Sequence, residues 1–303
     1  MPQRLFVFLQ LEFPWALGPA DGRYLLRDGP DAEAQHVVVL EALDGARASA
    51  ERRAAERPRG RLMGRLTGAA REREVQPEPQ PEAVTVTRAT VIDPVPLSAE
   101  QQARAWLEGL DRDRDVQAAV AVVNRVVWMQ RIAAADAYVH EVSTAQALVI
   151  RAGWGEGEQV AYGRWLHARE LKQHSEPRRR RNRAWALRPQ ERLAALLGGR
   201  SSPLMCEELA LRARLDLDHG RVALAAVGLD RALAAAALEL PAEGRQDLAL
   251  RVAELEQLRA GVAGQAELAL EQVAGGKALD ADLVSHALGR LEACLRARTA
   301  PGV

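Results

Sequence analysis

The stretch that decides the fold is "VQAAVAVVNRVVWMQRIAAADAYV", residues 116–139. Valines recur in it every three or four residues, the spacing that puts side chains on one face of a helix: Val116, Val120, Val123 and Val127. The only polar stripe is thin: Gln117, Asn124 and Arg131. A helix that is apolar almost all round is a buried helix. The stretch therefore predicts a central helix packed against a β-sheet.

Strand patterns lie on both sides of this helix. They are rich in Val, Ile and Thr and are bounded by Pro, Gly or Asp, as strands commonly are. The predicted strands cover residues 4–13, 19–27, 35–43, 83–93 and 147–152. Together with the helix they predict an α+β domain, with an antiparallel sheet and a buried central helix.

The glycine-rich stretch "RAGWGEGEQVAYGRW", residues 151–165, raises the question of a phosphate-binding loop. Its glycines read GxGxG and no GK[ST] follows, whereas a nucleotide fingerprint needs GxGxxG or a P-loop between a strand and a helix. Alternation after the glycines favours a β-hairpin with a glycine-rich turn. A phosphate site or another ligand loop remains an alternative, and residues 158–171 fit either a strand or a helix.

Two changes in composition divide the chain, one at residues 46–82 and one at residues 173–190, where arginines accumulate. Large apolar residues nearly vanish in 46–82, which ends in a Pro/Gln/Glu tract, so this segment cannot bury enough surface to offset the entropy of ordering. The expected organisation is β-strands in 1–45, a disordered basic and Pro-rich insertion in 46–82, the rest of the α+β domain in 83–172, a basic linker in 173–200 and an all-α domain of helical hairpins in 201–303.

In the last third, one pair of helices resembles a known repeat. Residues 204–240 are similar to a single tetratricopeptide-type helical hairpin in their small and large apolar positions and their turn: Leu209, Ala213, Gly220, Ala225, Leu229 and Ala232. Arg212 and Asp216 depart from that pattern, and no second copy follows, although solenoids need about three. The resemblance implies protein–protein interaction. No family is recognised for the rest of the chain.

Bulk composition is that of an ordinary soluble protein, with 48% hydrophobic residues and a formal net charge of zero. All but two of the 41 basic residues are arginine, as in GC-rich bacterial coding. The apolar start, residues 1–18, is interrupted by Gln10, Glu12 and Pro14, so it is too short and too polar for a signal peptide or membrane span. We expect a bacterial protein of the cytoplasm with no membrane partner.

The strongest chemical feature is the basic segment 176–200, which holds eight arginines against two glutamates. The candidate binding residues in it are Arg178, Arg179, Arg180, Arg181, Arg183 and Trp185. Arginines beside a stacking aromatic suit a nucleic-acid backbone or an unpaired base. They equally suit an acidic partner or the helical tail of another subunit, and a solvated linker is the third interpretation.

A weaker candidate is "DAYVHEVST", residues 136–144. Asp136 and His140 are one helical turn apart, with Glu141 beside them, a spacing that could support a metal or an acid–base pair. No second ligand cluster is evident, and a histidine is also favourable at the negative end of a helix dipole. We therefore predict no metal and no cofactor.

Neither cysteine, Cys206 nor Cys294, has a metal-ligand spacing, so both are expected to be buried free thiols. No nucleophile with a base at a family-typical spacing is present in the sequence. The prediction is a non-enzymatic, cytoplasmic interaction or assembly protein that binds a protein partner or itself through its C-terminal helices. The alternatives are an arginine-mediated nucleic-acid binder and an enzyme of unknown reaction.

Overall fold

The computed structural model describes residues 4–43, 85–171, 183–271 and 278–299, with the backbone alone for 183–188. The chain divides into two compact units, Met1–His174 and Ser175–Val303. The division lies within 173–200, where the sequence predicted a linker. The segment expected to be a disordered insertion, 46–82, lies outside the described residues.

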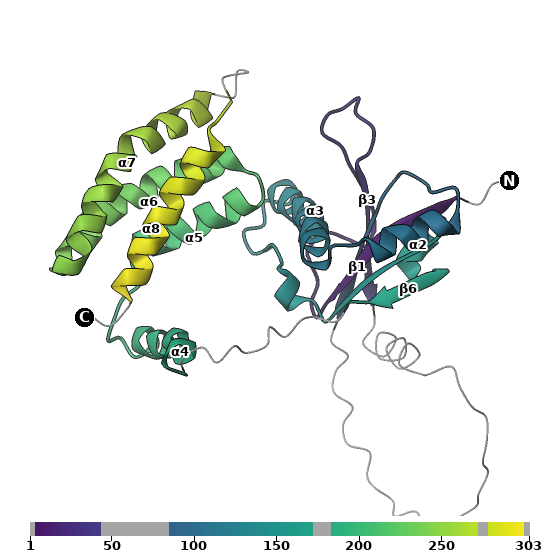
Figure 1. Ribbon diagram of the computed structural model, residues 1–303, viewed down its shortest axis with the longest axis horizontal. Helices are drawn as coiled ribbons and strands as arrows, with labels where there is room; N and C mark the ends of the chain where they lie inside the picture. The colour runs from purple at the N-terminus through teal and green to yellow at the C-terminus, as the bar shows by residue number, and fades with distance from the viewer. Residues whose placement is uncertain (1–3, 44–84, 172–182, 272–277, 300–303) are drawn as a thin grey trace, which may run out of the picture. The chain divides into compact units, whose positions relative to one another are not determined.

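The first unit is built on a six-stranded antiparallel sheet with the order β2-β3-β4-β1-β5-β6 (Figure 1). The strands are β1 (Leu5–Phe13), β2 (Gly22–Leu26), β3 (His36–Leu43), β4 (Val86–Ile92), β5 (Val149–Glu156) and β6 (His167–Glu170). β1 pairs with β4 on one side and β5 on the other. Together with the helices this confirms the predicted α+β class.

Helices α2 (Glu100–Glu108) and α3 (Arg112–Ala133) pack on one face of this sheet. Side chains alternate between the two faces of a strand, so Leu5, Val7 and Leu11 of β1 join the core beneath the helices. The short 3-10 helix η1 (Thr144–Gln146) leads from α3 back into β5.

Helix α3 corrects one prediction, because it is buried on one face and not almost all round. Its valines at 116, 120, 123 and 127 are buried, but Met129 and Ile132 at its C-terminal end are exposed. Asn124, expected in the polar stripe, is also buried: its side chain donates to the Val142 carbonyl and accepts from the Val142 N–H, each at 2.8 Å. A buried amide is tolerated because both its groups are hydrogen-bonded.

The opposite face of the sheet is covered by a second 3-10 helix, η2 (Gly157–Tyr162), and by Trp165. Val160 and Ala161 of η2 pack there with Phe8, whose ring centroid is 5.9 Å from that of Trp165. Residues 158–171 are thus neither one strand nor one helix, since η2 is followed by the short strand β6.

The glycines of residues 151–165 do not form the predicted turn. Gly153 and Gly155 lie within β5, Gly157, with φ of +63°, begins the connection to β6, and Gly163, with φ of +80°, ends η2 within that connection. A Cβ at Gly153 would lie 2.2 Å from the His167 carbonyl oxygen. Gly153 is therefore required for the close approach of β6, and the predicted hairpin is formed by β5 and β6 with η2 in its loop.

The second unit is helical and comprises α4 (Arg183–Leu197), α5 (Met205–Asp218), α6 (Val222–Ala242), α7 (Gln246–Glu271) and α8 (Ala281–Arg298). Helix α4 corrects the prediction that all of 173–200 is a linker, because the strong helix formers Ala, Leu, Gln and Arg dominate 184–197. No helix in the described parts of the chain is long and apolar enough to cross a membrane.

Alanines let α5 and α6 pack closely around the turn at Gly220, whose φ is +71°. Ala213, Ala225 and Ala232 are fully buried between them. At the N-terminus of α5, Glu239 of α6 accepts the N–H groups of Met205 and Cys206 at 2.9 and 3.0 Å, which fastens the two helices together.

Candidate functional site

The predicted arginine site falls largely outside what the structure describes. Arg178, Arg179, Arg180 and Arg181 precede the described helix, while Arg183 and Trp185 lie in α4 at positions where only the backbone is described. Farther along the same helix, Arg192 forms an ion pair with Glu207 of α5 at 2.5 Å. A described arginine of this segment thus engages an acidic residue of the helical unit.

The residues Asp136, His140 and Glu141 do not form the predicted one-turn pair, because α3 has already ended. Ala135, with φ of +50°, closes the helix: its N–H bonds the Ile132 carbonyl and the next N–H bonds the Arg131 carbonyl. This is the left-handed ending common at helix C-termini. The Asp136 carboxylate accepts the Tyr138 N–H at 2.8 Å, and both Asp136 and His140 are exposed.

Metal-ligand chemistry finds no support in the described residues, where no group of three or more His, Cys, Asp or Glu is arranged to hold an ion. Both cysteines are buried free thiols, as predicted. Burial, together with the hydrogen bond and charge of Glu239, raises the pKa of the Cys206 thiol to about 12. Because the thiolate is the nucleophile, a buried thiol with so high a pKa is a poor nucleophile near neutral pH.

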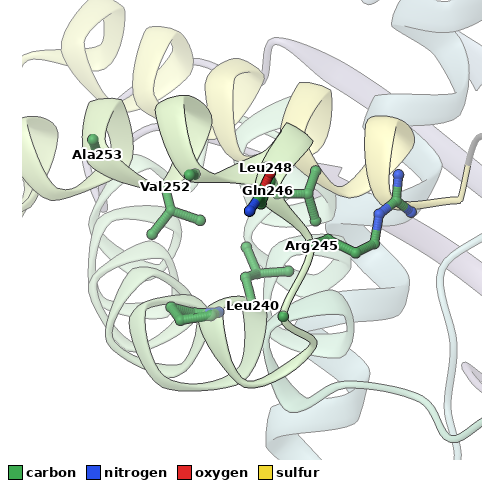
Figure 2. A pocket seen from close by; sticks show the side chains of 9 residues that line it. Leu240, Arg245, Gln246, Leu248, Val252 and Ala253 are labelled. Carbon is green, nitrogen blue, oxygen red and sulfur yellow. The ribbon is translucent and has the colours of Figure 1, made fainter. Parts of the chain in front are cut away.

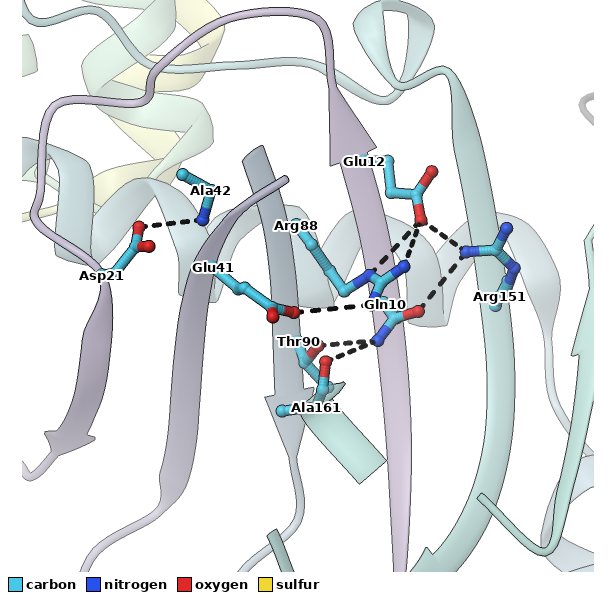
Figure 3. A network of polar contacts seen from close by, with 9 residues as sticks. All are labelled: Gln10, Glu12, Asp21, Glu41, Ala42, Arg88, Thr90, Arg151 and Ala161. Carbon is cyan, nitrogen blue, oxygen red and sulfur yellow. Dashed lines mark hydrogen bonds and ion pairs between the residues drawn. The ribbon is translucent and has the colours of Figure 1, made fainter. Parts of the chain in front are cut away.

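One feature that the sequence did not predict is a buried polar network on the sheet face under η2 (Figure 3). The Glu12 carboxylate accepts from Arg151 at 2.7 Å and from Arg88 at 3.1 Å. Arg88 also reaches Glu41 at 3.5 Å. Gln10 donates to Thr90 at 3.0 Å and accepts from Arg151 at 3.4 Å. The network therefore links four adjacent strands, β3, β4, β1 and β5.

The charges of this network hold one another in place. Burial alone would raise the pKa of the Glu12 carboxyl, but the charges and hydrogen bonds of Arg151 and Arg88 outweigh burial and lower that pKa below its ordinary value. The guanidinium of Arg151 also lies over the Trp165 ring, 5.9 Å from its centroid. An ionised carboxylate clamped between two arginines is a weak base, so the network suits fixing strand positions better than proton transfer.

The sequence does carry a signal for this network. Gln10 and Glu12 occupy alternate positions in β1 and interrupt an otherwise apolar run, and Arg88 and Thr90 do the same in β4. Polar residues at alternate strand positions indicate one sheet face. Their burial and their pairing could be assigned only after the order of the strands was known.

The surface that best fits the predicted interaction function is an apolar groove between α6 and α7, with a volume of about 440 Å³ (Figure 2). Leu240 of α6 and Leu248 of α7, each 1% exposed, form its base together with Val252 of α7, and Arg245 and Gln246 also line it. Ala249 and Ala253 leave its mouth open, because their side chains are short and exposed. We call its five apolar residues, Leu240, Leu248, Ala249, Val252 and Ala253, the α6–α7 groove.

A network of ion pairs fixes the end of the helical unit at which the groove begins. Arg245 bonds Asp247 at 2.5 and 3.0 Å and also donates to the Arg298 backbone carbonyl. Arg298 in turn bonds Glu243 at 2.6 Å and Glu207 at 3.0 Å. These contacts join the ends of α5, α6, α7 and α8, so the groove has a rigid base at this end.

Comparison of the chain with protein-family models, with curated proteins and with solved structures gave no match.

Proposed function

We propose that this chain is a non-enzymatic interaction or assembly protein whose helical unit binds a helical segment of a partner protein in the α6–α7 groove. The observation that carries the proposal is the open apolar groove on a rigid helical base. Apolar helix faces commonly dock into such grooves through residues one turn apart. The exposed leucines Leu238 and Leu250, at 78% and 85% exposure, add apolar surface on the same two helices.

Charge specifies the partner further. Within the helical unit, residues 204–303, which hold α5 to α8 and the groove, contain 11 basic and 15 acidic side chains, a net charge of about −4, whereas residues 176–200 hold eight arginines against two glutamates. Opposite charge on two surfaces steers their encounter and sets specificity. The proposed partner segment is therefore an amphipathic helix with an apolar face and basic flanks, and the resemblance of 204–240 to a tetratricopeptide-type hairpin supports the same class of function.

The test uses a partner identified by affinity purification from the native host and then reconstituted with the purified chain. Ala253→Arg fills the mouth of the groove from an exposed position and is expected to weaken binding at least about tenfold, which is about 1.4 kcal/mol. Ala260→Arg is the matched control, because Ala260 is an exposed alanine of the same helix and does not line the groove. Equal loss in both variants, or no loss in either, would contradict the proposal.

The alternative function, nucleic-acid binding, is distinguished from this proposal by measuring how affinity for DNA or RNA depends on salt in the wild type and in an arginine variant. Each phosphate contact releases counterions, so affinity for nucleic acid falls steeply with salt. Replacing Arg178, Arg179, Arg180 and Arg181 by alanine would remove up to about four such contacts and flatten the salt slope by about 0.9 for each. A tight, salt-sensitive complex with DNA or RNA that this variant loses would rank the alternative above our proposal.

A further inference from the structure

A second pocket, in the first unit, lies between the sheet and the helices that cover it, and has a volume of about 440 Å³. Its floor is apolar and comes from β1 and β4, through Val7, Leu9 and Val91. Small residues on the two helices, among them Ala119, leave the space open. Cavities of about 300–1,000 Å³ with an apolar lining and few polar groups are typical small-molecule sites.

The polar groups that line this pocket are His36, Asp93, Arg114 and Asp115, and the exposed Asp93 and Arg114 mark its mouth. Asp115 already accepts the Asp111 N–H and the Arg114 Nε–H, both at 2.9 Å. Asp93 accepts the Val95 N–H at 2.9 Å through one oxygen, and among the described residues no ion pair reaches its carboxylate. With two carboxylates against one guanidinium, the mouth carries a net negative charge and Asp93 can accept a further donor.

Two further groups bear on the ligand. Trp106 of α2 lines the pocket and offers an aromatic surface on which a cation is attracted to the ring. Burial lowers the pKa of the His36 imidazole and Arg125 lowers it further, against the opposing charges of Asp93 and Asp28. A neutral His36 adds no positive charge to repel a cation at neutral pH.

We propose that this pocket binds a small molecule with an apolar ring or alkyl body and a protonated amine head. The body lies on Val7, Leu9 and Val91, and the amine is held at the mouth by Asp93 beside Trp106. An anionic head is disfavoured, because it would face both Asp93 and Asp115. This site belongs to the first unit and does not depend on the function proposed for the helical unit.

Phenethylamine is the probe, titrated into the full chain by calorimetry beside 3-phenylpropanoate and 2-phenylethanol, which present an acid and a neutral head on the same body. We expect saturable binding at millimolar concentration or below, with the amine tightest. Asp93→Asn keeps the shape and the acceptor for Val95 but removes the charge, so it should weaken the amine about two- to fivefold. Asp31→Asn, an exposed aspartate outside the pocket, is the matched control and should change nothing.

A second variant tests the cavity itself. Ala119→Leu fills the pocket from the α3 side and should reduce phenethylamine binding at least about tenfold, with thermal melting used to confirm that the variant is folded. If it is not folded, Val122→Phe, which fills the same pocket from the next turn of α3, replaces it. The proposal is overturned if phenethylamine fails to saturate, if the acid binds as tightly as the amine, if Asp93→Asn leaves the amine unchanged, or if a folded pocket-filling variant binds like the wild type.

Discussion

Both faces of the six-stranded sheet are buried, but by different means. Under α2 and α3 the strands present hydrocarbon, and Leu11 is 0% exposed. Under η2 the same strands present an apolar cluster around Phe8 together with a carboxylate and two guanidinium groups, and Arg88 is 1% exposed. Burial of apolar area is non-directional, whereas an ion pair needs its partners at defined distances. The first face therefore supplies stability in bulk, and the second is sensitive to strand register.

The largest effect is expected on the apolar face. Val123→Asp places a carboxylate at a fully buried position of α3, where it has no partner. The cost should be several kcal/mol, comparable with a total stability of ~5–15 kcal/mol, so soluble protein should be lost. Met129→Asp is the control, because Met129 lies on the same helix and is 46% exposed. Two variants that melt alike would show that α3 does not cover the core.

A smaller loss of stability is expected when the central carboxylate of the buried polar network is removed. Glu12→Ala removes the acceptor shared by Arg88 and Arg151 and should cost about 3–5 kcal/mol in urea unfolding, because a buried charge is left without its partner. Replacing all three residues, as Glu12→Leu with Arg88→Met and Arg151→Met, should recover most of that loss. If the single variant is as stable as the wild type, the network is not a constraint on the fold.

The smallest effect is a change in how steeply the free energy of unfolding depends on pH. Because the folded pKa of Glu12 lies below its ordinary value, its stabilising contribution is present above about pH 4.5 and is lost as pH falls through the folded pKa. The protonated acid can still accept a hydrogen bond, so the loss is smaller than on truncation. In Glu12→Gln, the free energy of unfolding should therefore fall less steeply with decreasing pH than in the wild type. If the two proteins give parallel curves of unfolding free energy against pH, the acid sensitivity belongs to other carboxylates.

Strands β1 to β5 were predictable because each rests on its own local pattern, whereas β6 (His167–Glu170) was not predicted. The apolar alternation in residues 4–13 and the Val-rich run in 35–43 each specify a strand without reference to the rest of the chain. The helices α7 and α8 carry the same kind of local signal, because apolar residues recur in them every three or four positions and include the buried Leu255 and Leu288. Local periodicity is sufficient where a single element decides its own conformation.

The features that could not be predicted from the sequence depend mostly on contacts between residues that are distant along the chain. Gly153 was predicted to lie in a turn, since nothing in its neighbourhood reveals that the His167 carbonyl passes 2.2 Å from where a Cβ would stand. The predicted end of α3, and with it the one-turn spacing of Asp136 and His140, was wrong because Ala135 adopts a left-handed conformation although alanine is a good helix former. The polar network around Glu12 and the α6–α7 groove could not be predicted, because they depend on which strands pair and which helices pack together. No local sequence pattern contains that information.

The central place of β1 has a consequence for the order in which the first unit is made. Leu5 pairs with Glu156, so the earliest strand to leave the ribosome bonds to one of the last strands of the unit. At ~5–20 residues per second, β1 waits roughly 8–30 s for this partner to be synthesised. Until α2 and α3 have been synthesised, the apolar side chains of β1 have no helices to cover them, and β5 follows later still. Completion of the sheet is therefore a late event in the synthesis of this unit, and β1 is the strand that waits longest for a partner.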